Sequence, residues 1–159
     1  MSADARREEI MSMFRSSREE LMGAIDGLTD AQMVDPSIDG WSVKDHLAHI
    51  SEWDEMRYVE ILRVSEGLQP AVPLFGPQEM DQFNELIISK RREWSLQQVL
   101  AELEFTRTKI LEAIARCNDA ALDQSNYRAV GLEGGAQHEL EHALHIRNWR
   151  GSTDSKPSV

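Results

Sequence analysis

The five histidines of the chain fall in two short segments, and their spacing is the feature of this sequence that could carry chemistry. His46 and His49 lie in the first segment, and His138, His142 and His145 lie in the second. Residues four apart on a helix lie on one face, about 40° apart, so His138 and His142 can direct both imidazoles at one metal ion. A third imidazole from the first segment would complete a three-histidine site with open coordination positions, which is typical of catalytic metal sites.

Spacing leaves open which histidine of the first segment completes the site. On a helical wheel, His46 lies near the middle of the apolar stripe with Trp53, whereas His49 lies at its edge, so spacing alone slightly favours His46. His145 could be a ligand, or could donate a hydrogen bond to one. Histidine pairs with this spacing are also common on solvated helices without a metal, where the imidazoles form ion pairs or helix caps.

Three carboxylates near the histidines are candidates for acid–base chemistry: Glu52, Glu139 and Glu141. For each of them a solvated surface position is the more ordinary role, because glutamate is rarely buried. The segment from His138 to His142 also has the form H-E-x-x-H, in which the glutamate of a metalloprotease activates metal-bound water. The chain offers no convincing third ligand downstream and no substrate-binding strand, so we do not expect a protease.

Composition excludes several classes of protein. The 159 residues suit a single domain, and 17 basic against 28 acidic residues give a net charge of −11, which disfavours nucleic-acid binding. No apolar run approaches the ~20 residues of a membrane span, and the first residues do not resemble a signal peptide, so we expect neither. The single cysteine, Cys117, cannot form an internal disulfide, and we expect a cytoplasmic protein in which it is a small residue at a helix end.

Apolar residues at three- and four-residue steps predict an all-α protein, a four-helix bundle. The expected helices cover residues 4–26, 42–67, 80–117 in two pieces, and 134–151. Ser42 with Asp45 and Ser95 with Gln98 have the spacing of capping boxes. A proline-rich loop at residues 68–78 separates the second helix from the third, and the connector after Cys117 has room for one short helical turn. Residues 1–151 form one predicted domain, and residues 152–159 a disordered polar tail.

Two motifs resemble the signatures of the DinB-like superfamily. In GWSVKDHLAHISEWDE, Trp-Ser opens the helix, a histidine follows eight residues after Trp41, and Trp53 comes next; that histidine is His49. In HELEHALHIRNW, the pattern His-x₃-His-x₃-Ile matches His138, His142 and Ile146. The middle of the chain also reads like members of this group, so the resemblance extends from the first helix to about residue 149.

The resemblance implies a DinB-like four-helix bundle in which His49, His138 and His142 hold a divalent metal ion, with zinc or nickel as the expected metals. It selects His49 where the helical wheel favours His46, and it leaves His46 and His145 outside the site. Because the group also resembles thiol-dependent transferases, we expect a metal-dependent enzyme for a small molecule, a thiol S-transferase or a hydrolase, with a low-molecular-weight thiol as a partner. Two alternatives stay open: a metal-free bundle that binds or sequesters a small ligand, and an interaction protein whose bundle face forms a homodimer.

Overall fold

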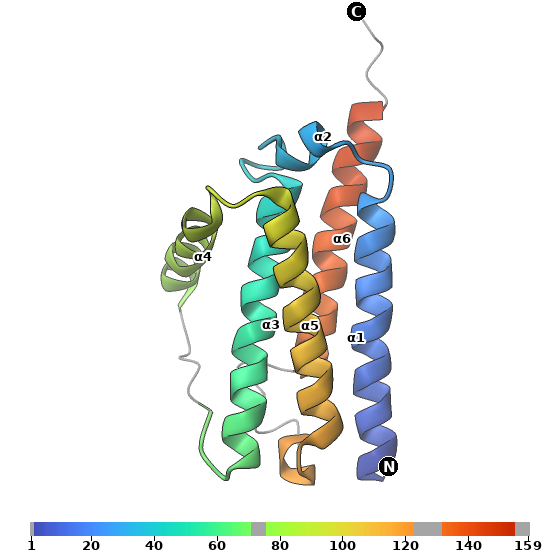
Figure 1. Ribbon diagram of the computed structural model, residues 1–159, viewed down its shortest axis with the longest axis vertical. Helices are drawn as coiled ribbons and strands as arrows, with labels where there is room; N and C mark the ends of the chain where they lie inside the picture. Colours follow the sequence, from blue (N-terminus) through green and yellow to red (C-terminus); the bar gives the residue numbers. More distant parts are fainter. Residues whose placement is uncertain (1, 71–75, 123–131, 155–159) are drawn as a thin grey trace, which may run out of the picture.

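Four long helices form the body of the protein. The computed structural model describes residues 2–70, 76–122 and 132–154. The bundle helices are α1 (Ala3–Ile25), α3 (Val43–Ser65), α5 (Leu96–Arg116) and α6 (Leu132–Asp154) (Figure 1). In the described ranges the only β pairing is an isolated bridge between Ile38 and Trp41, so the predicted all-α fold is confirmed. None of the described helices is long and apolar enough to cross a membrane.

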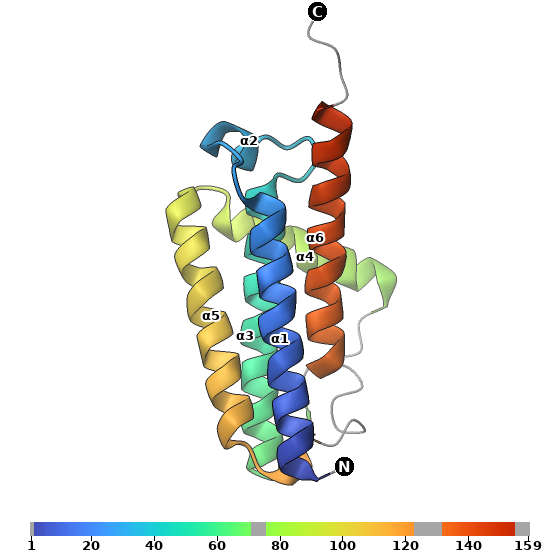
Figure 2. The same cartoon turned by 90° about the vertical axis from the view of Figure 1, so that its right-hand side faces the viewer.

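The chain direction explains the crossover between the second and third bundle helices. α1 and α6 run one way and pack on each other, while α3 and α5 run the other way and form the opposite pair (Figures 1 and 2). Because α3 and α5 are parallel, the connection must return to the end where α3 begins. It contains α4 (Pro77–Arg91), which packs against α3 outside the bundle. The first piece of the predicted third helix is therefore a separate helix, and residues 71–75 of the predicted loop lie outside the described residues.

Local capping signals place the helix ends. Ser42 caps α3 and Ser95 caps α5, each in the capping box that the sequence predicts. Cys117 is the C-cap of α5, where its buried thiol donates to the carbonyl of Ile114 at 3.2 Å and burial raises its pKa. The prediction that Cys117 is a helix-end residue is therefore confirmed.

Two further helical segments differ from the sequence prediction, and a third agrees with it. The short α2 (Asp30–Val34) lies between the first two predicted helices, where the sequence analysis predicts no helix, and it has a capping box of its own between Thr29 and Gln32. A 3-10 turn at Asp119–Leu122 matches the short turn expected after Cys117, while residues 123–131 of that connector lie outside the described residues. α6 continues to Asp154 instead of ending at residue 151, so the first residues of the predicted polar tail are helical. Residues 155–159 lie outside the described residues.

The apolar core consists of two clusters with a charged layer between them. One cluster contains Leu21, Leu47, Ile50 and Ile146, and the other contains residues further along the bundle such as Phe14. The residues between these stretches of α1, α3, α5 and α6 are buried but charged: Arg18, Asp54, Arg57, Arg107 and Glu139. Buried charges of this kind require close partners, and the ion pairs described below supply them.

Candidate metal centre

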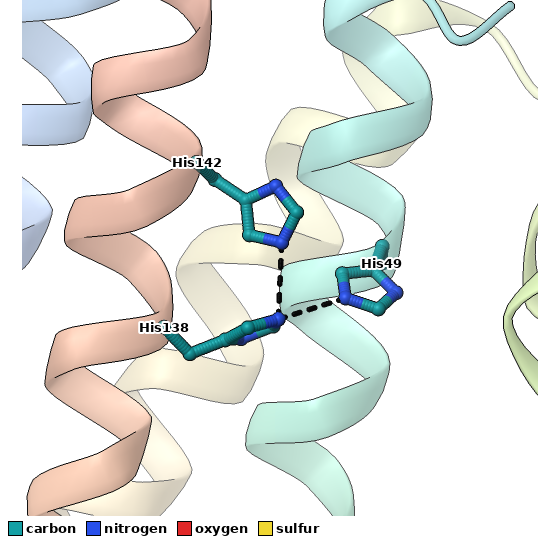
Figure 3. A group of neighbouring side chains, drawn as sticks. All are labelled: His49, His138 and His142. Atoms are coloured by element: carbon teal, nitrogen blue, oxygen red, sulfur yellow. Dashed lines mark hydrogen bonds between the residues drawn. The ribbon is translucent and has the colours of Figure 1, made fainter. Parts of the chain in front are cut away.

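α3 and α6 bring three histidines together. His49 projects from α3, and His138 and His142 project from successive turns of α6 toward it (Figure 3). The Ser42 cap fixes the start of α3, so His49 lies about two turns into a regular helix. The four-residue step on α6 places its two histidines one above the other on the face that meets α3.

The Nε2 atoms of these histidines converge. Nε2 of His138 lies 2.9 Å from Nε2 of His49 and 3.0 Å from Nε2 of His142. One ring nitrogen from each of the three histidines lies within 4.8 Å of the other two, so a single cation could contact all three. In the part of the chain that the structure describes, this is the group of three side chains whose geometry suits a metal ion.

His46 lies close to the three histidines, on the side of His142 that is turned away from His49 and His138. Its Nδ1 lies 2.7 Å from Nδ1 of His142, the ring nitrogen of His142 that points away from the other two histidines. His46 is buried, at 5% exposure, whereas His145 is exposed and its ring centre lies 6.4 Å from that of His142. The helical wheel favours His46 as the partner of His138 and His142. In the structure, His49 brings a ring nitrogen close to theirs, and His46 instead contacts His142 from the other side.

The environment of the cluster keeps its imidazoles neutral. Burial, followed by the neighbouring His138, lowers the pKa of His49 to about 2. Burial, followed by the nearby Arg57 guanidinium, lowers the pKa of His138 to about 4. Burial and the adjacent imidazoles lower the pKa of His142 in the same direction. Neutral imidazole is the form that binds metal ions, so the cluster is in its ligand state at neutral pH.

A small cavity adjoins His49 and His138 on the side facing α4. Its volume is about 270 Å³, and it is lined by His49, Trp53, Arg57, Met80, Asn84 and His138. The ring of Trp53 packs edge-on against Phe83 of α4, with ring centres 5.8 Å apart. α4 therefore forms one wall of the cavity, so the connection between α3 and α5 contributes residues to the site.

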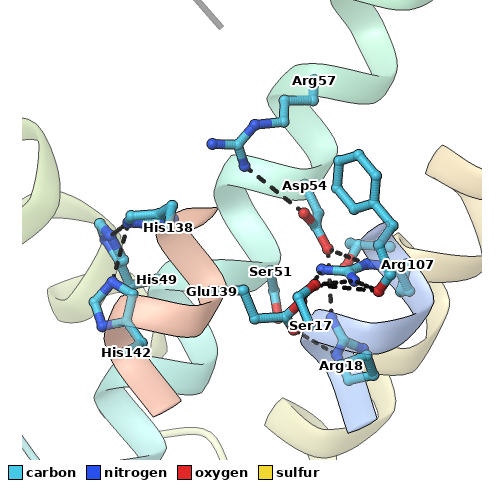
Figure 4. A network of polar contacts seen from close by, with 12 residues as sticks. Ser17, Arg18, His49, Ser51, Asp54, Arg57, Arg107, His138, Glu139 and His142 are labelled. Carbon is cyan, nitrogen blue, oxygen red and sulfur yellow. Dashed lines mark hydrogen bonds and ion pairs between the residues drawn. The ribbon is translucent and has the colours of Figure 1, made fainter. Parts of the chain in front are cut away.

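The three carboxylates considered from the sequence lie away from the cluster. Glu139 is fully buried and points toward α1 and α5, where it accepts hydrogen bonds from Arg18 at 2.6 Å and Arg107 at 2.7 Å (Figure 4). Glu52 pairs with Arg91 at 2.6 Å, and Glu141 is exposed. Glu139 is thus neither solvated, as its residue type suggested, nor placed as the base of a metalloprotease.

Sequence reasoning missed the charged layer beneath the histidines. Asp54 accepts from Arg107 at 2.9 Å and lies 3.4 Å from Arg18 and 3.7 Å from Arg57 (Figure 4). Burial opposes the charge of Glu139, but Arg107 and Arg18 outweigh it and lower the pKa of that carboxyl. The available signal was the position of Asp54 and Arg57 on the inward face of a helix, where charged residues need partners from other helices.

Comparison with known proteins supports the fold. A family model described as the DinB superfamily matches residues 13–149. An uncharacterised protein from Escherichia coli UTI89 has a similar structure, with a TM-score of 0.77 and 16% sequence identity over 95% of this chain and 96% of the other. No curated protein matches the chain. At this identity the structural match concerns the fold alone.

Proposed function

The chain belongs to the DinB superfamily, and from that membership together with its three converging histidines we propose that it is a metal-dependent enzyme acting on a small molecule. His49, His138 and His142 would hold a divalent ion, zinc or nickel, through their Nε2 atoms. The reaction proposed is transfer to or from a low-molecular-weight thiol, with hydrolysis as the second reaction type. The observation that carries the proposal is the convergence of three neutral imidazoles from two helices on one point.

The donor set fits an ion of this kind. Two nitrogen ligands of a tetrahedral zinc ion at 2.0–2.1 Å lie ~3.3 Å apart. The 2.9 Å and 3.0 Å separations around His138 are a few tenths of an ångström shorter, so small side-chain rotations would reach the metal geometry. Without a cation, Nε2 of His138 lies within hydrogen-bond distance of two other ring nitrogens, but it can donate at most one hydrogen. A shared metal ion removes this problem, because all three nitrogens can then direct their lone pairs at the ion.

Three protein ligands leave coordination positions open. A divalent ion held in this way would lower the pKa of a thiol or a water that reaches it. The protein would orient the three ligands and limit the access of water to the ion. Two tryptophans support this role: the ring centre of Trp41 lies 5.3 Å from that of His49, and Trp53 lies between the histidines and Phe83 of α4. The cavity beside His49 and His138 provides the space for a small substrate.

Elemental analysis of the untagged protein tests the metal. We expect close to one equivalent of zinc or nickel after purification, and its loss in His49→Ala and in His142→Ala. His145→Ala is the matched control, because it removes an exposed histidine from the same helix and should keep the metal. Equal metal content in the wild type and in the His49→Ala/His142→Ala double variant would reject the site and leave a metal-free ligand-binding bundle.

A thiol screen tests the reaction. The metal-loaded protein is incubated with an electrophilic small molecule and, in separate samples, with glutathione, bacillithiol, mycothiol or no thiol. Consumption that depends on one of these thiols and on the metal supports a transferase. Consumption that depends on the metal but not on any thiol supports a hydrolase, and consumption unaffected by removal of the metal contradicts both.

A further inference from the structure

Several residues that line the cavity beside His49 and His138 carry hydrogen-bond donors. They include Arg57, Trp53 and the two histidines, and none of the residues that line the cavity carries a carboxylate. The chain has 28 acidic and 17 basic residues, so a lining without any acid stands out from the rest of the molecule. A cavity of this composition favours a negatively charged occupant.

Several of these polar atoms have no hydrogen-bond partner. Among the described residues, Nε1 of Trp53, Oδ1 of Asn84 and Nδ1 of His49 and His138 are buried without one. Leaving a buried donor or acceptor unsatisfied is unfavourable, so such atoms commonly pair with a ligand or a bound water. Trp53 is only 7% exposed, and it is one of the residues that line the cavity.

Arg57 brings the positive charge into this wall. Its guanidinium carbon lies 5.8 Å from the centre of the Trp53 ring, and its Nη1 lies 3.7 Å from Asp54 behind it. Burial, more than any other effect, lowers its pKa to about 10, so Arg57 stays charged at neutral pH. The ion pair with Asp54 involves one terminal nitrogen of the guanidinium, Nη1, while Arg57 also lines the cavity. Arginine with an indole N–H beside it is a suitable pair of donors for the two oxygens of a carboxylate.

We propose that this cavity binds the substrate as a small organic carboxylate, with the carboxylate on Trp53 Nε1–H and the Arg57 guanidinium and the rest of the molecule directed toward the three histidines. A cavity volume of about 270 Å³ suits an acid of a few carbon atoms. The inference rests on the proposed function for its location, and it adds the chemical class of the substrate.

The test follows the indole N–H resonances of ¹⁵N-labelled protein during titration with butyrate. The chain has four tryptophans, and Trp53→Phe assigns the signal of Trp53 by its disappearance. We expect butyrate to shift that signal and the neutral isostere butyramide to leave it in place. Inorganic phosphate serves as the second oxyanion and should bind at least tenfold more weakly than butyrate.

Two variants measure the contribution of the donors. Trp53→Phe removes the N–H while keeping an aromatic ring, and it should weaken butyrate binding tenfold or more in calorimetry. Trp94→Phe is the matched control, because Trp94 is 36% exposed and lies outside the cavity lining, and it should leave the affinity unchanged. Arg57→Lys should also weaken binding. Because Arg57 belongs to the buried charged layer, cooperative thermal denaturation of this variant must first show that it is folded before its affinity for butyrate is compared with the wild type.

The same titrations in metal-loaded and in chelated protein separate this inference from the proposed function. Butyrate binding that persists after chelation and depends on Trp53 supports the carboxylate site whether or not the protein holds a metal. Equal binding of butyrate and butyramide, tighter binding of phosphate, or unchanged affinity in Trp53→Phe would each overturn the inference. Binding that vanishes on chelation would also overturn it, because the carboxylate would then be held by the metal alone.

Discussion

His46 and His142 meet across the α3–α6 contact through their Nδ1 atoms, which lie 2.7 Å apart. Nε2 of His142 points the other way, toward His138 at 3.0 Å. With Nε2 bound to a metal ion, His142 would carry its hydrogen on Nδ1 and donate it to His46. In many metal sites a carboxylate or a carbonyl accepts this hydrogen and fixes the orientation of the ligand ring. Here a second imidazole is positioned for that task.

His46→Ala should therefore weaken metal binding without abolishing it. Loss of a hydrogen-bond acceptor behind a ligating histidine typically reduces metal affinity ~10–100-fold. The dissociation constant for zinc, measured by competition with a chelator of known affinity, checks the expectation. His46→Asn keeps a side-chain acceptor and should recover part of the loss.

Two control variants are compared with His46→Ala. His49→Ala should remove the metal completely, and His145→Ala should leave the dissociation constant unchanged. If His46→Ala empties the site while His49→Ala retains the metal, the helical-wheel assignment is right and the roles given to these two residues are exchanged.

Much of the fold could be predicted from the sequence because its signals are local. The capping box at Ser42 and the apolar spacing on α3 and α6 depend on residues within a few turns of each other. The choice between His46 and His49 is not local, because it depends on how α3 is rotated against α6. The helical wheel slightly favours His46 and the family motif selects His49; in the structure it is His49 whose ring nitrogen lies close to those of His138 and His142.

The charged layer shows what local signals leave out. The residue type of Glu139 predicts solvent exposure, but its partners Arg18 and Arg107 come from two other helices. The spacing of residues within α6 carries no information about partners on other helices. The same limit explains why the position of α4 beside the cavity could not be derived: its amphipathic pattern predicts a helix but does not say which helix it packs against.

Acid should destabilise the metal-free protein in a defined window. Burial lowers the pKa of His46 to about 4 and that of His49 to about 2, whereas an unfolded chain has histidine pKa values near ~6.5. Below that value the unfolded state binds more protons than the folded state, so the free energy of unfolding falls as pH decreases from about 6.5 toward 4 and is constant above. Each such histidine contributes a slope of up to ~1.4 kcal/mol per pH unit.

Urea denaturation of the chelated protein at a series of pH values measures this slope. His49→Gln should reduce it, because the amide does not titrate, while His145→Gln removes an exposed imidazole and should not. A free energy of unfolding that stays constant between pH 6.5 and 5 would contradict the burial assigned to these histidines. Added zinc should shift the acid limit downward, because ligation holds the imidazoles neutral.

Glu139→Ala should be strongly destabilising while leaving the metal in place. The substitution removes the carboxylate that pairs with both Arg18 and Arg107, and breaking a buried ion pair by removing one partner costs ~3–5 kcal/mol. Glu141→Ala, two residues along the same helix but exposed, should change stability by less than ~0.5 kcal/mol. Urea denaturation gives both values. Metal content per folded protein should be unchanged in Glu139→Gln, since this side chain faces away from the histidines; loss of metal there would place it in the site after all.

The adjacent glycines Gly134 and Gly135 should respond to alanine in opposite directions. A Cβ on Gly135 would lie 2.8 Å from Nε of Arg57 and 2.9 Å from Cζ of Phe14, whereas a Cβ on Gly134 would meet nothing within 4 Å. Phe14 is fully buried and cannot move aside freely, so Gly135→Ala should cost ~1–3 kcal/mol through overpacking. Gly134→Ala adds only helix propensity and should stabilise by up to ~1 kcal/mol.

The same pair of variants also reports on the cavity. Because the added methyl group on Gly135 presses on Arg57, it should displace the guanidinium and weaken binding of a small carboxylate together with stability. Gly134→Ala should leave that affinity at the wild-type value. Thermal denaturation and butyrate calorimetry on both proteins measure the two effects. A Gly135→Ala protein that is as stable as Gly134→Ala would mean that Arg57 and Phe14 do not pack against α6 as closely as the structure shows, and the position of Arg57 in the cavity wall would have to be revised.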